Sequence, residues 1–306
     1  MKLEFLLCGS PTDSFFSQMA FFRLCLDRLG GAYREARLVC VFGDHETQDI
    51  PRRWQPHFSN IEVRWAHVPG ASNPDHLLQH EMRFELVDPA ADLAILCDAD
   101  VALLRPLDGL VAALKDRPAI AGVIAHAHFQ WPGRGRGSEA DWRLLAEAFL
   151  DAPLDRPYHY TLQPKTPGSM SPFYINMGVM IGTPAMFARY HEVARTIQPR
   201  VAELLGNWWA PQVSLPLICA AGNLPTLALP MRYNCPNDVR IDTLYPEEAE
   251  NIVFLHYLRE THFKRSEVFN SPDAFDAFLS ADFEGPDRAF QAIVREVTGG
   301  RFPFPA

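Results

Sequence analysis

Apolar residues follow two rhythms along the chain, short continuous runs and spacings of three and four residues. The first run covers residues 3–8 and ends at Gly9-Ser10-Pro11. A spaced set then leads up to Gly30-Gly31 and consists of Phe15, Met19, Phe22, Leu26 and Leu29. A continuous run is typical of a buried strand, and the spaced set places its members on one face of a helix. The chain is therefore expected to open with a strand, a turn and an amphipathic helix.

The alternation of runs and spaced sets continues through the chain. Strands are expected at residues 38–42, 61–68, 93–104, 119–129, 176–182, 224–229 and 251–258. Helices are expected at 76–87, 109–116, 139–150, 184–205, 212–221, from Ser271-Pro272 onward and at 287–297, with irregular connections at 131–137 and 151–172. Strands that alternate with helices predict one open α/β sheet, in which ligands bind beyond the carboxyl ends of the strands.

One run differs from the others because it contains two carboxylates. Asp98 and Asp100 lie within the apolar residues 93–104, with one small residue between them. Two buried like charges repel each other, and each is costly unless another group neutralises it. Residues i and i+2 of a strand share a face, so both carboxylates can reach one divalent cation where the strand leaves the sheet. The alternative is that one aspartate caps a turn and the other pairs with an arginine.

A distant histidine can complete this site. His256 lies near the end of the last expected strand, at 251–258. Carboxylate oxygens favour hard cations, and a single imidazole shifts the preference from Mg²⁺ toward Mn²⁺. Three protein ligands leave positions open for the oxygens of a substrate diphosphate, whose developing charge a cation stabilises as a bond breaks. For His256 alone, the alternative is a core histidine that is hydrogen-bonded to the backbone.

The composition limits the classes of protein to which the chain can belong. Its 306 residues, 48% hydrophobic and 21% charged, suffice for one large α/β domain. The net charge of −9 argues against a dedicated nucleic-acid binder. The six cysteines are scattered without a Cys-x-x-Cys pair, and no apolar run approaches the length of a membrane span. We therefore expect reduced thiols and a cytoplasmic protein, with peripheral attachment to a membrane left open.

Five segments resemble, in order, the motifs of one enzyme family. They are Cys97-Asp98-Ala99-Asp100, Asn176-Met-Gly-Val, Gln212 in a Trp-rich segment, Leu229-Pro-Met-Arg-Tyr-Asn234 and Asn251-Ile-Val-Phe-Leu-His256. This set resembles the Asp-x-Asp and later motifs of the GT-A-fold glycosyltransferases, in particular the retaining family 8 enzymes related to glycogenin and the galactosyltransferases. The resemblance implies a Rossmann-like, mixed but mostly parallel sheet flanked by helices. It also implies a single domain with a nucleotide-binding half at 1–104 and a half for donor sugar and acceptor at 105–306.

The resemblance also implies roles for individual residues. Asp98, Asp100 and His256 would bind Mn²⁺ or Mg²⁺. Asn176 would hydrogen-bond the donor sugar, and Gln212 would lie beneath its anomeric carbon, where an amide stabilises developing positive charge. The donor would further be held by Cys8, Gly9, Ser10, Arg83, Ala99, Gly178 and Lys264, with His262 as the alternative to Lys264.

Each of these residues also has an ordinary structural alternative. Arg83 could be a cation on a helix surface. Asn176 could be a turn residue, Gly178 could permit tight packing, and Gln212 could be a residue at a helix N-terminus. The chain also departs from the family pattern, because Pro211 precedes Gln212 where the family has Asp and no Lys-Pro-Trp follows His256. The resemblance therefore identifies a divergent relative.

The function expected on this basis is transfer of a hexose from a nucleotide diphosphate sugar, with uridine as the base, to an acceptor hydroxyl. Retention of the anomeric configuration is implied by the resemblance. The acceptor is left open among a glycan, a lipid and a protein, a homodimer is left open, and no nucleic acid is expected as a partner.

Two other classes of protein are alternatives. A phosphohydrolase of the haloacid dehalogenase type also uses Asp-x-Asp, with Asp98 as the nucleophile. That class has Thr or Val at the position of Ala102, and its motif follows the first strand of the domain. A non-catalytic sugar-nucleotide-binding protein would keep the fold and bind a nucleotide without turnover.

Overall fold

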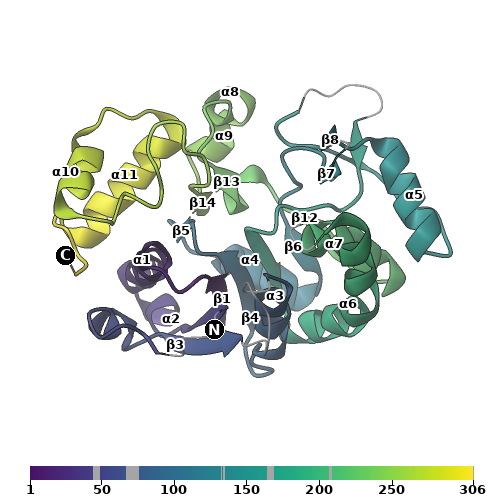
Figure 1. Cartoon of the computed structure of the whole chain (residues 1–306), viewed down its shortest axis with the longest axis horizontal. Helices are drawn as coiled ribbons and strands as arrows, with labels where there is room; N and C mark the ends of the chain where they lie inside the picture. The colour runs from purple at the N-terminus through teal and green to yellow at the C-terminus, as the bar shows by residue number, and fades with distance from the viewer. Residues whose placement is uncertain are drawn as a thin grey trace.

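The centre of the molecule is a seven-stranded sheet in the order β12-β6-β11-β4-β1-β2-β3 (Figure 1). The computed structural model describes residues 1–43, 49–66, 76–131, 133, 135–163, 169–206 and 209–305. The strands of this sheet are β1 (Leu3–Gly9), β2 (Arg37–Gly43), β3 (Glu62–Ala66), β4 (Leu93–Asp98), β6 (Ile120–Gly122), β11 (Val179–Gly182) and β12 (Thr226–Ala228). β11 is antiparallel to β4 and β6, and the other neighbours are parallel. The mixed, mostly parallel sheet expected from the sequence is confirmed.

Helices cover both faces of this sheet (Figure 1). They are α1 (Asp13–Leu29), α2 (Gly31–Arg34), α3 (His76–Glu85), α4 (Asp108–Asp116), α5 (Glu139–Phe149), α6 (Pro184–Leu205), α7 (Ala210–Ala221), α8 (Ile241–Leu244), α9 (Pro246–Ala249), α10 (Pro272–Ser280) and α11 (Gly285–Thr298), with 3-10 turns at Gln55–Phe58 and Met231–Tyr233. Side chains alternate along β1. Phe5 and Leu7 belong to the core that α1 and α11 cover, and Leu6 belongs to the core that α6 and α7 cover. Because both faces are buried, the central strands are continuous apolar runs in the sequence.

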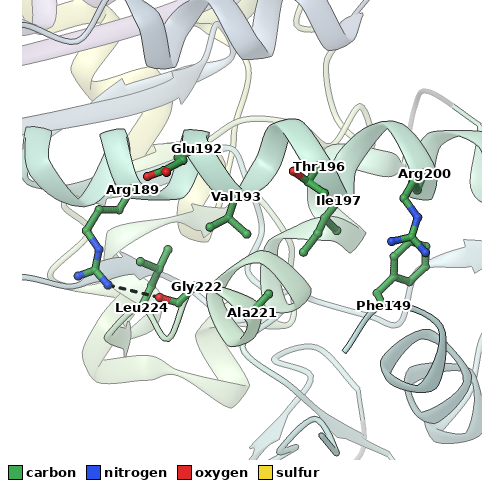
Figure 2. Close-up of a pocket in the computed structure, with 10 residues that line it drawn as sticks. All are labelled: Phe149, Arg189, Glu192, Val193, Thr196, Ile197, Arg200, Ala221, Gly222 and Leu224. Atoms are coloured by element: carbon green, nitrogen blue, oxygen red, sulfur yellow. Dashed lines mark hydrogen bonds between the residues drawn. The ribbon is translucent and has the colours of Figure 1, made fainter. Parts of the chain in front are cut away.

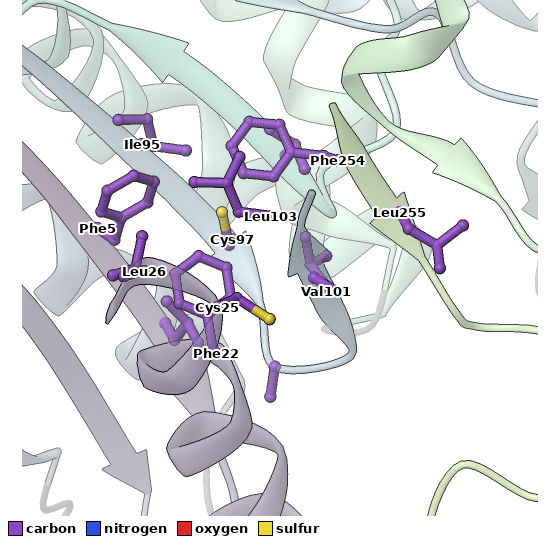
Figure 3. Packing of buried hydrophobic residues seen from close by; sticks show 14 of the residues in the cluster. Phe5, Phe22, Cys25, Leu26, Ile95, Cys97, Val101, Leu103, Phe254 and Leu255 are labelled. Atoms are coloured by element: carbon purple, nitrogen blue, oxygen red, sulfur yellow. The ribbon is translucent and has the colours of Figure 1, made fainter. Parts of the chain in front are cut away.

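A second, smaller sheet packs with the first around α1. It contains β13 (Cys235–Pro236), β14 (Phe254–His256) and β5 (Val101–Leu103), in the order β13-β14-β5. Figure 3 shows Cys25 of α1 in the same apolar cluster as Leu103 of β5 and Phe254 of β14. Phe5 of β1 belongs to this cluster too, so one core holds the two sheets together.

The expectation of one strand at 93–104 is wrong. β4 ends at Asp98, a turn follows at Ala99-Asp100, and β5 then leaves the main sheet to pair with β14. The two aspartates therefore do not share a strand face. The residues of β5 are as completely buried as those of β4, so the apolar pattern runs on across the turn and conceals it.

Other elements differ from expectation mainly in length. The strand expected at 119–129 is reduced to β6, after which an isolated bridge joins Ile124 to Ile175. The expected strand at 61–68 and the expected connections at 131–137 and 151–172 include residues 67, 68, 132, 134 and 164–168, which lie outside the described residues. Within these two connections, β7 (Gln130–Trp131) pairs with β8 (Gly135–Arg136), and β9 (Tyr158–His159) pairs with β10 (Met170–Ser171).

Two expectations about helices can be compared directly with the structure. Ser271 caps α10 as its sequence predicts, because its Oγ accepts a hydrogen bond of 3.2 Å from the backbone nitrogen of Ala274. Within the described parts of the chain, no helix combines the length and the apolar character needed to cross a membrane.

Candidate metal centre

The ends of β4 and β14 bring three ligand atoms together. Asp98 is the last residue of β4, and His256 is the last residue of β14. Pairing of His256 with Val101 places the histidine beside the turn that carries Asp100. Nε2 of His256 lies 3.2 Å from Oδ1 of Asp100 and 3.9 Å from Oδ2 of Asp98. The three ligand atoms all lie within 4.8 Å of one another. In the described part of the chain, this is the one group of His, Cys, Asp or Glu side chains whose geometry suits a metal ion.

These separations fit a divalent cation. Metal–oxygen bonds of about 2.1 Å in an octahedron place neighbouring ligands about 3 Å apart and opposite ligands about 4 Å apart. The His256 and Asp100 side chains are 5% and 10% exposed, whereas the Asp98 side chain is 38% exposed. The cluster is therefore enclosed at His256 and Asp100 and open to solvent at Asp98, as a metal that also binds substrate requires.

A chain of hydrogen bonds determines which nitrogen of His256 faces the carboxylates. The buried Asn234 donates through Nδ2 to the backbone oxygen of Asn176 at 3.0 Å. Its Oδ1 is therefore the acceptor for Nδ1 of His256, also at 3.0 Å. Nδ1 therefore carries a proton, and Nε2 is the nitrogen that faces the carboxylates and can exchange its proton for a cation.

Gly178 leaves room for the imidazole of His256. A Cβ at this position would overlap the ring atoms Cε1 and Nδ1 of His256 and would lie 3.0 Å from Oδ1 of Asn176. The backbone nitrogen of Gly178 donates to Oδ1 of Asn176 at 2.9 Å, and the backbone nitrogen of Asp98 donates to the oxygen of Gly178 at 3.0 Å. Close approach of backbone to the imidazole therefore accounts for glycine at this position.

Positive side chains oppose the charges of the two carboxylates. Burial alone would raise the pKa of Asp100, but the charges of His256 and Arg265 lower it to about 2. Desolvation, and then repulsion from Asp100, raise the pKa of Asp98. Burial would lower the pKa of His256, but the two aspartates outweigh that effect and raise it above its ordinary value. The alternative in which one aspartate pairs with an arginine is also met, because Arg265 pairs with Asp100. The ion pair and the three-ligand geometry therefore occur at the same carboxylate.

The end of β1 lies directly beside Asp98. Cys8 is the register partner of Asp98, Gly9 ends the strand, and Ser10 follows it. Burial raises the pKa of Cys8 to about 11, so this thiol is protonated at neutral pH. Ala99, 2% exposed, lies in the turn between the two aspartates. The residues expected to contact the nucleotide thus lie along one edge of the sheet, and their contacts with a donor stay predictions.

Arg83 is a buried cation rather than a surface one. Its side chain is completely buried, and Nη1 donates to the backbone oxygen of Cys97 at 2.9 Å. Its charge opposes the rise in the pKa of Cys8 and of Asp98. The alternative of an ordinary helix-surface cation is therefore wrong, and α3 supplies positive charge beside the end of β4.

The two residues expected to contact the donor sugar lie on adjoining segments. Nε2 of Gln212, in the first turn of α7, donates to the backbone oxygen of Ile175 at 2.9 Å. The next residue, Asn176, accepts hydrogen bonds from Asn234 through both its backbone oxygen and its Oδ1. Gln212 and Asn176 are thereby connected to His256 through the backbone of residues 175–178 and through Asn234.

Sequence reasoning missed the cation that contacts the cluster after β14. Lys264 is exposed and pairs with Glu267 at 3.0 Å, and Nδ1 of His262 hydrogen-bonds Oδ2 of Asp287 at 2.6 Å. Arg265 instead contacts Oδ2 of Asp100. The one signal for Arg265 in the sequence is that it directly follows Lys264.

A second buried histidine lies in the electrostatic field of the cluster. Oγ1 of Thr161 donates to the backbone oxygen of Ile124 at 3.2 Å and therefore accepts from Nδ1 of His126 at 2.9 Å. Nε2 of His126 then carries the lone pair, and it is buried without a hydrogen-bond partner among the described residues. Burial, followed by the positive charges of His256 and Arg259, lowers the pKa of His126 to about 3. This imidazole is therefore neutral at neutral pH.

The hollow in Figure 2 is separate from the cluster. It has a volume of about 520 Å³ and lies between α6 and α7, where Arg189 donates to the backbone oxygen of Gly222 at 3.3 Å. The guanidinium of Arg200 stacks 4.7 Å above the ring of Phe149 at its other end. None of the residues expected in the site lines this hollow. The candidate site is therefore located by its ligand chemistry and not by the volume of a pocket.

Solved structures that resemble this one are glycosyltransferases. The chain superposes on the bifunctional glycosyltransferase WbbM with a TM-score of 0.52 and 11% identity, over 99% of this chain and 52% of that chain. Against the galactosyltransferase LgtC in complex with donor and acceptor sugar analogues, the TM-score is 0.48 and the identity 11%, over 99% and 97% of the two chains. Against mouse xyloside xylosyltransferase 1, the TM-score is 0.48 and the identity 10%, over 86% and 99%. No family model and no curated protein matches the sequence.

The superposition on WbbM identifies the fold. The architecture is that of the GT-A glycosyltransferases, and the chain spans about half the length of WbbM.

Proposed function

We propose that this protein is a glycosyltransferase that transfers a hexose from a nucleotide diphosphate sugar to an acceptor hydroxyl, with Mn²⁺ or Mg²⁺ as cofactor. The observation that carries the proposal is the cluster of Asp98, Asp100 and His256, set at the carboxyl ends of strands in a GT-A fold. Ligands of open α/β sheets bind at this edge. A cation held there would stabilise the negative charge that develops on the diphosphate as the sugar leaves.

The side chains around the cluster have separate tasks in this proposal. Asn234 holds the protonated Nδ1 of His256 and keeps Nε2 available as a ligand. Arg83 supplies positive charge beside the β4 end, which favours an anionic group there. Nε2 of Gln212 is engaged with Ile175, so Oε1 is the atom through which this amide would stabilise positive charge at the anomeric carbon.

The finer parts of the proposal rest on the resemblance of the motifs. These are uridine as the base, retention at the anomeric carbon, and donor contacts by Asn176, Gly178 and Lys264. They also include the division into a nucleotide-binding half at 1–104 and a half for sugar and acceptor at 105–306. Pro211 replaces the carboxylate that the family carries before Gln212. We therefore propose a hexose as the donor sugar and do not assign a particular one.

Thermal unfolding with a panel of nucleotides tests the proposal. Uridine, guanosine and adenosine diphosphates and their hexose conjugates would each be added with Mn²⁺ and with EDTA. A ligand that binds the native state raises the free energy of unfolding, by about 2.7 kcal/mol at a hundredfold excess over Kd. We expect uridine diphosphate and its hexose conjugates to raise the melting temperature in Mn²⁺ and not in EDTA.

Release of the nucleotide from the stabilising donor is the second measurement. Turnover that rises when acceptor hydroxyls are supplied would support transfer. Stabilisation without turnover against a broad acceptor panel would favour the non-catalytic binding protein. If no nucleoside diphosphate stabilises the protein in Mn²⁺, the proposal is wrong.

A further inference from the structure

The two oxygens of Asp100 face different partners. Oδ1 lies 3.2 Å from Nε2 of His256, on the side where a cation would bind. Oδ2 is held by Nη1 of Arg265. The Asp100 side chain is only 10% exposed, so these two partners, rather than solvent, compensate its negative charge. The guanidinium thus occupies one half of a carboxylate that belongs to the candidate metal centre.

A guanidinium and a divalent cation oppose each other at this carboxylate. Both are positive, and their repulsion is strong at separations of a few ångströms away from bulk water. A carboxylate that is already paired with a guanidinium is also a weaker ligand, because its charge is partly neutralised. Arg265 therefore lowers the affinity of the empty centre for metal as long as it stays on Asp100.

Arg265 is held less firmly than the ligands. His256 and Asp100 are set by the pairing of β14 with β5 and by a hydrogen bond of 3.0 Å from the backbone nitrogen of Tyr257 to the oxygen of Asp100. Arg265 lies in a turn between β14 and α10, its side chain is 40% exposed, and its second ionic partner, Glu260, is 3.8 Å away. The guanidinium can therefore leave Asp100 without disturbing the sheet.

We propose that Arg265 is an internal counter-ion that a divalent cation displaces from Asp100, and that the freed guanidinium then pairs with the diphosphate of the donor. This inference rests on the proposed function. A planar guanidinium suits phosphate oxygens through paired N–H donors. Metal and nucleotide diphosphate then favour each other's binding, because each takes one of the two partners of the Arg265–Asp100 ion pair.

Calorimetric titrations of wild type, Arg265→Gln and Arg117→Gln test this exchange. Arg117 is the matched control, because its side chain is 92% exposed and its loss changes the net charge equally. Titrated with MnCl₂ alone, Arg265→Gln should bind at least tenfold more tightly than Arg117→Gln. Titrated with uridine diphosphate in saturating MnCl₂, Arg265→Gln should bind about tenfold more weakly than Arg117→Gln. Arg265→Lys keeps the charge and should retain the weak Mn²⁺ binding of wild type, which excludes a general loss of folding as the cause.

The expected result is that Arg265→Gln raises the affinity for Mn²⁺ and lowers the affinity for uridine diphosphate. Mn²⁺ affinity of Arg265→Gln that equals or falls below that of Arg117→Gln overturns the inference, since Arg265 would then be neutral toward the metal or would orient Asp100 for it. In that case, Mn²⁺-dependent binding of uridine diphosphate by wild type would still support the proposed function. Absence of Mn²⁺-dependent nucleotide binding in wild type would overturn both.

Discussion

Oδ1 of Asn234 accepts a hydrogen bond of 3.0 Å from Nδ1 of His256, while Nδ2 of the same amide donates to the backbone oxygen of Asn176. The amide can meet both partners in one orientation only, and that orientation leaves Nε2 as the nitrogen that faces Asp98 and Asp100. The ligand set therefore depends on a buried residue that binds no substrate itself.

Asn234→Ala should weaken Mn²⁺ binding by about 10- to 100-fold, because His256 loses the partner that selects its tautomer and ring position. Isothermal titration with MnCl₂ measures the effect. Asn251→Ala is the control, since Asn251 is an amide that donates to the backbone oxygen of Glu247 at a partly exposed position. Equal Mn²⁺ affinity in the two variants would show that Asn234 does not orient His256.

Gly178→Ala should displace the imidazole of His256, because the added Cβ would overlap two atoms of this buried ring. We expect a loss of stability of about 1–3 kcal/mol from overpacking and a loss of Mn²⁺ binding. Gly109→Ala is the matched control, because a Cβ there meets nothing within 4 Å. Urea unfolding and metal titration of both variants measure the two effects. Unchanged Mn²⁺ affinity in Gly178→Ala would contradict the close packing of glycine and histidine.

The clustering of Asp98, Asp100 and His256 could be predicted from the sequence because their chemistry is unusual for their surroundings. Asp98 and Asp100 interrupt a buried run, and His256 ends another strand. Burial on both faces makes the central strands continuous apolar runs, so most elements of the sheet could be predicted as well. Both features are determined by the local sequence.

The turn at Ala99-Asp100 and the ion pair between Arg265 and Asp100 could not be predicted from local patterns. The residues after the turn are as apolar as those before it, so no polar break marks the change of sheet. Arg265 reaches Asp100 across a separation of 165 residues, and only the folding of the segment between β14 and α10 brings it there. Lys264, its neighbour, has the same charge and faces Glu267 instead. Charge alone therefore does not identify which of the two cations contacts the site.

Asp100→Asn should abolish the Mn²⁺-dependent part of nucleotide binding, because it removes an anionic ligand from the cluster. The fold should persist, since the loss of the pairs with Arg265 and His256 is partly offset by the end of repulsion toward Asp98. Asp116→Asn, at a position whose side chain is 79% exposed, controls for the change in net charge. Melting temperatures with uridine diphosphate in Mn²⁺ and in EDTA measure the effect. A Mn²⁺-dependent shift retained in Asp100→Asn would show that Asp100 is not a ligand.

His126 makes stability depend on pH in a defined direction. Its pKa is lowered to about 3 by burial and by the charges of His256 and Arg259, with a further positive charge from Arg240 and an opposing one from Asp238. The unfolded chain takes up a proton at this histidine below its ordinary pKa of about 6.5, whereas the native protein does not until about pH 3. The contribution of neutral His126 to the free energy of unfolding is therefore fully present above about pH 6.5. It is lost as the pH falls from about 6.5 to about 3.

His126→Asn should remove that pH dependence, because Asn can still donate to Oγ1 of Thr161 and does not titrate. Between pH 7.0 and 5.5, wild type should lose about 1.3 kcal/mol more of its free energy of unfolding than the variant, from the uptake of one proton by the unfolded state. Urea unfolding at the two pH values measures this difference, and the contributions of the other histidines cancel in it. His159→Asn, at an exposed position, should instead follow wild type. If His126→Asn loses as much stability as wild type on acidification, His126 is not a buried neutral imidazole.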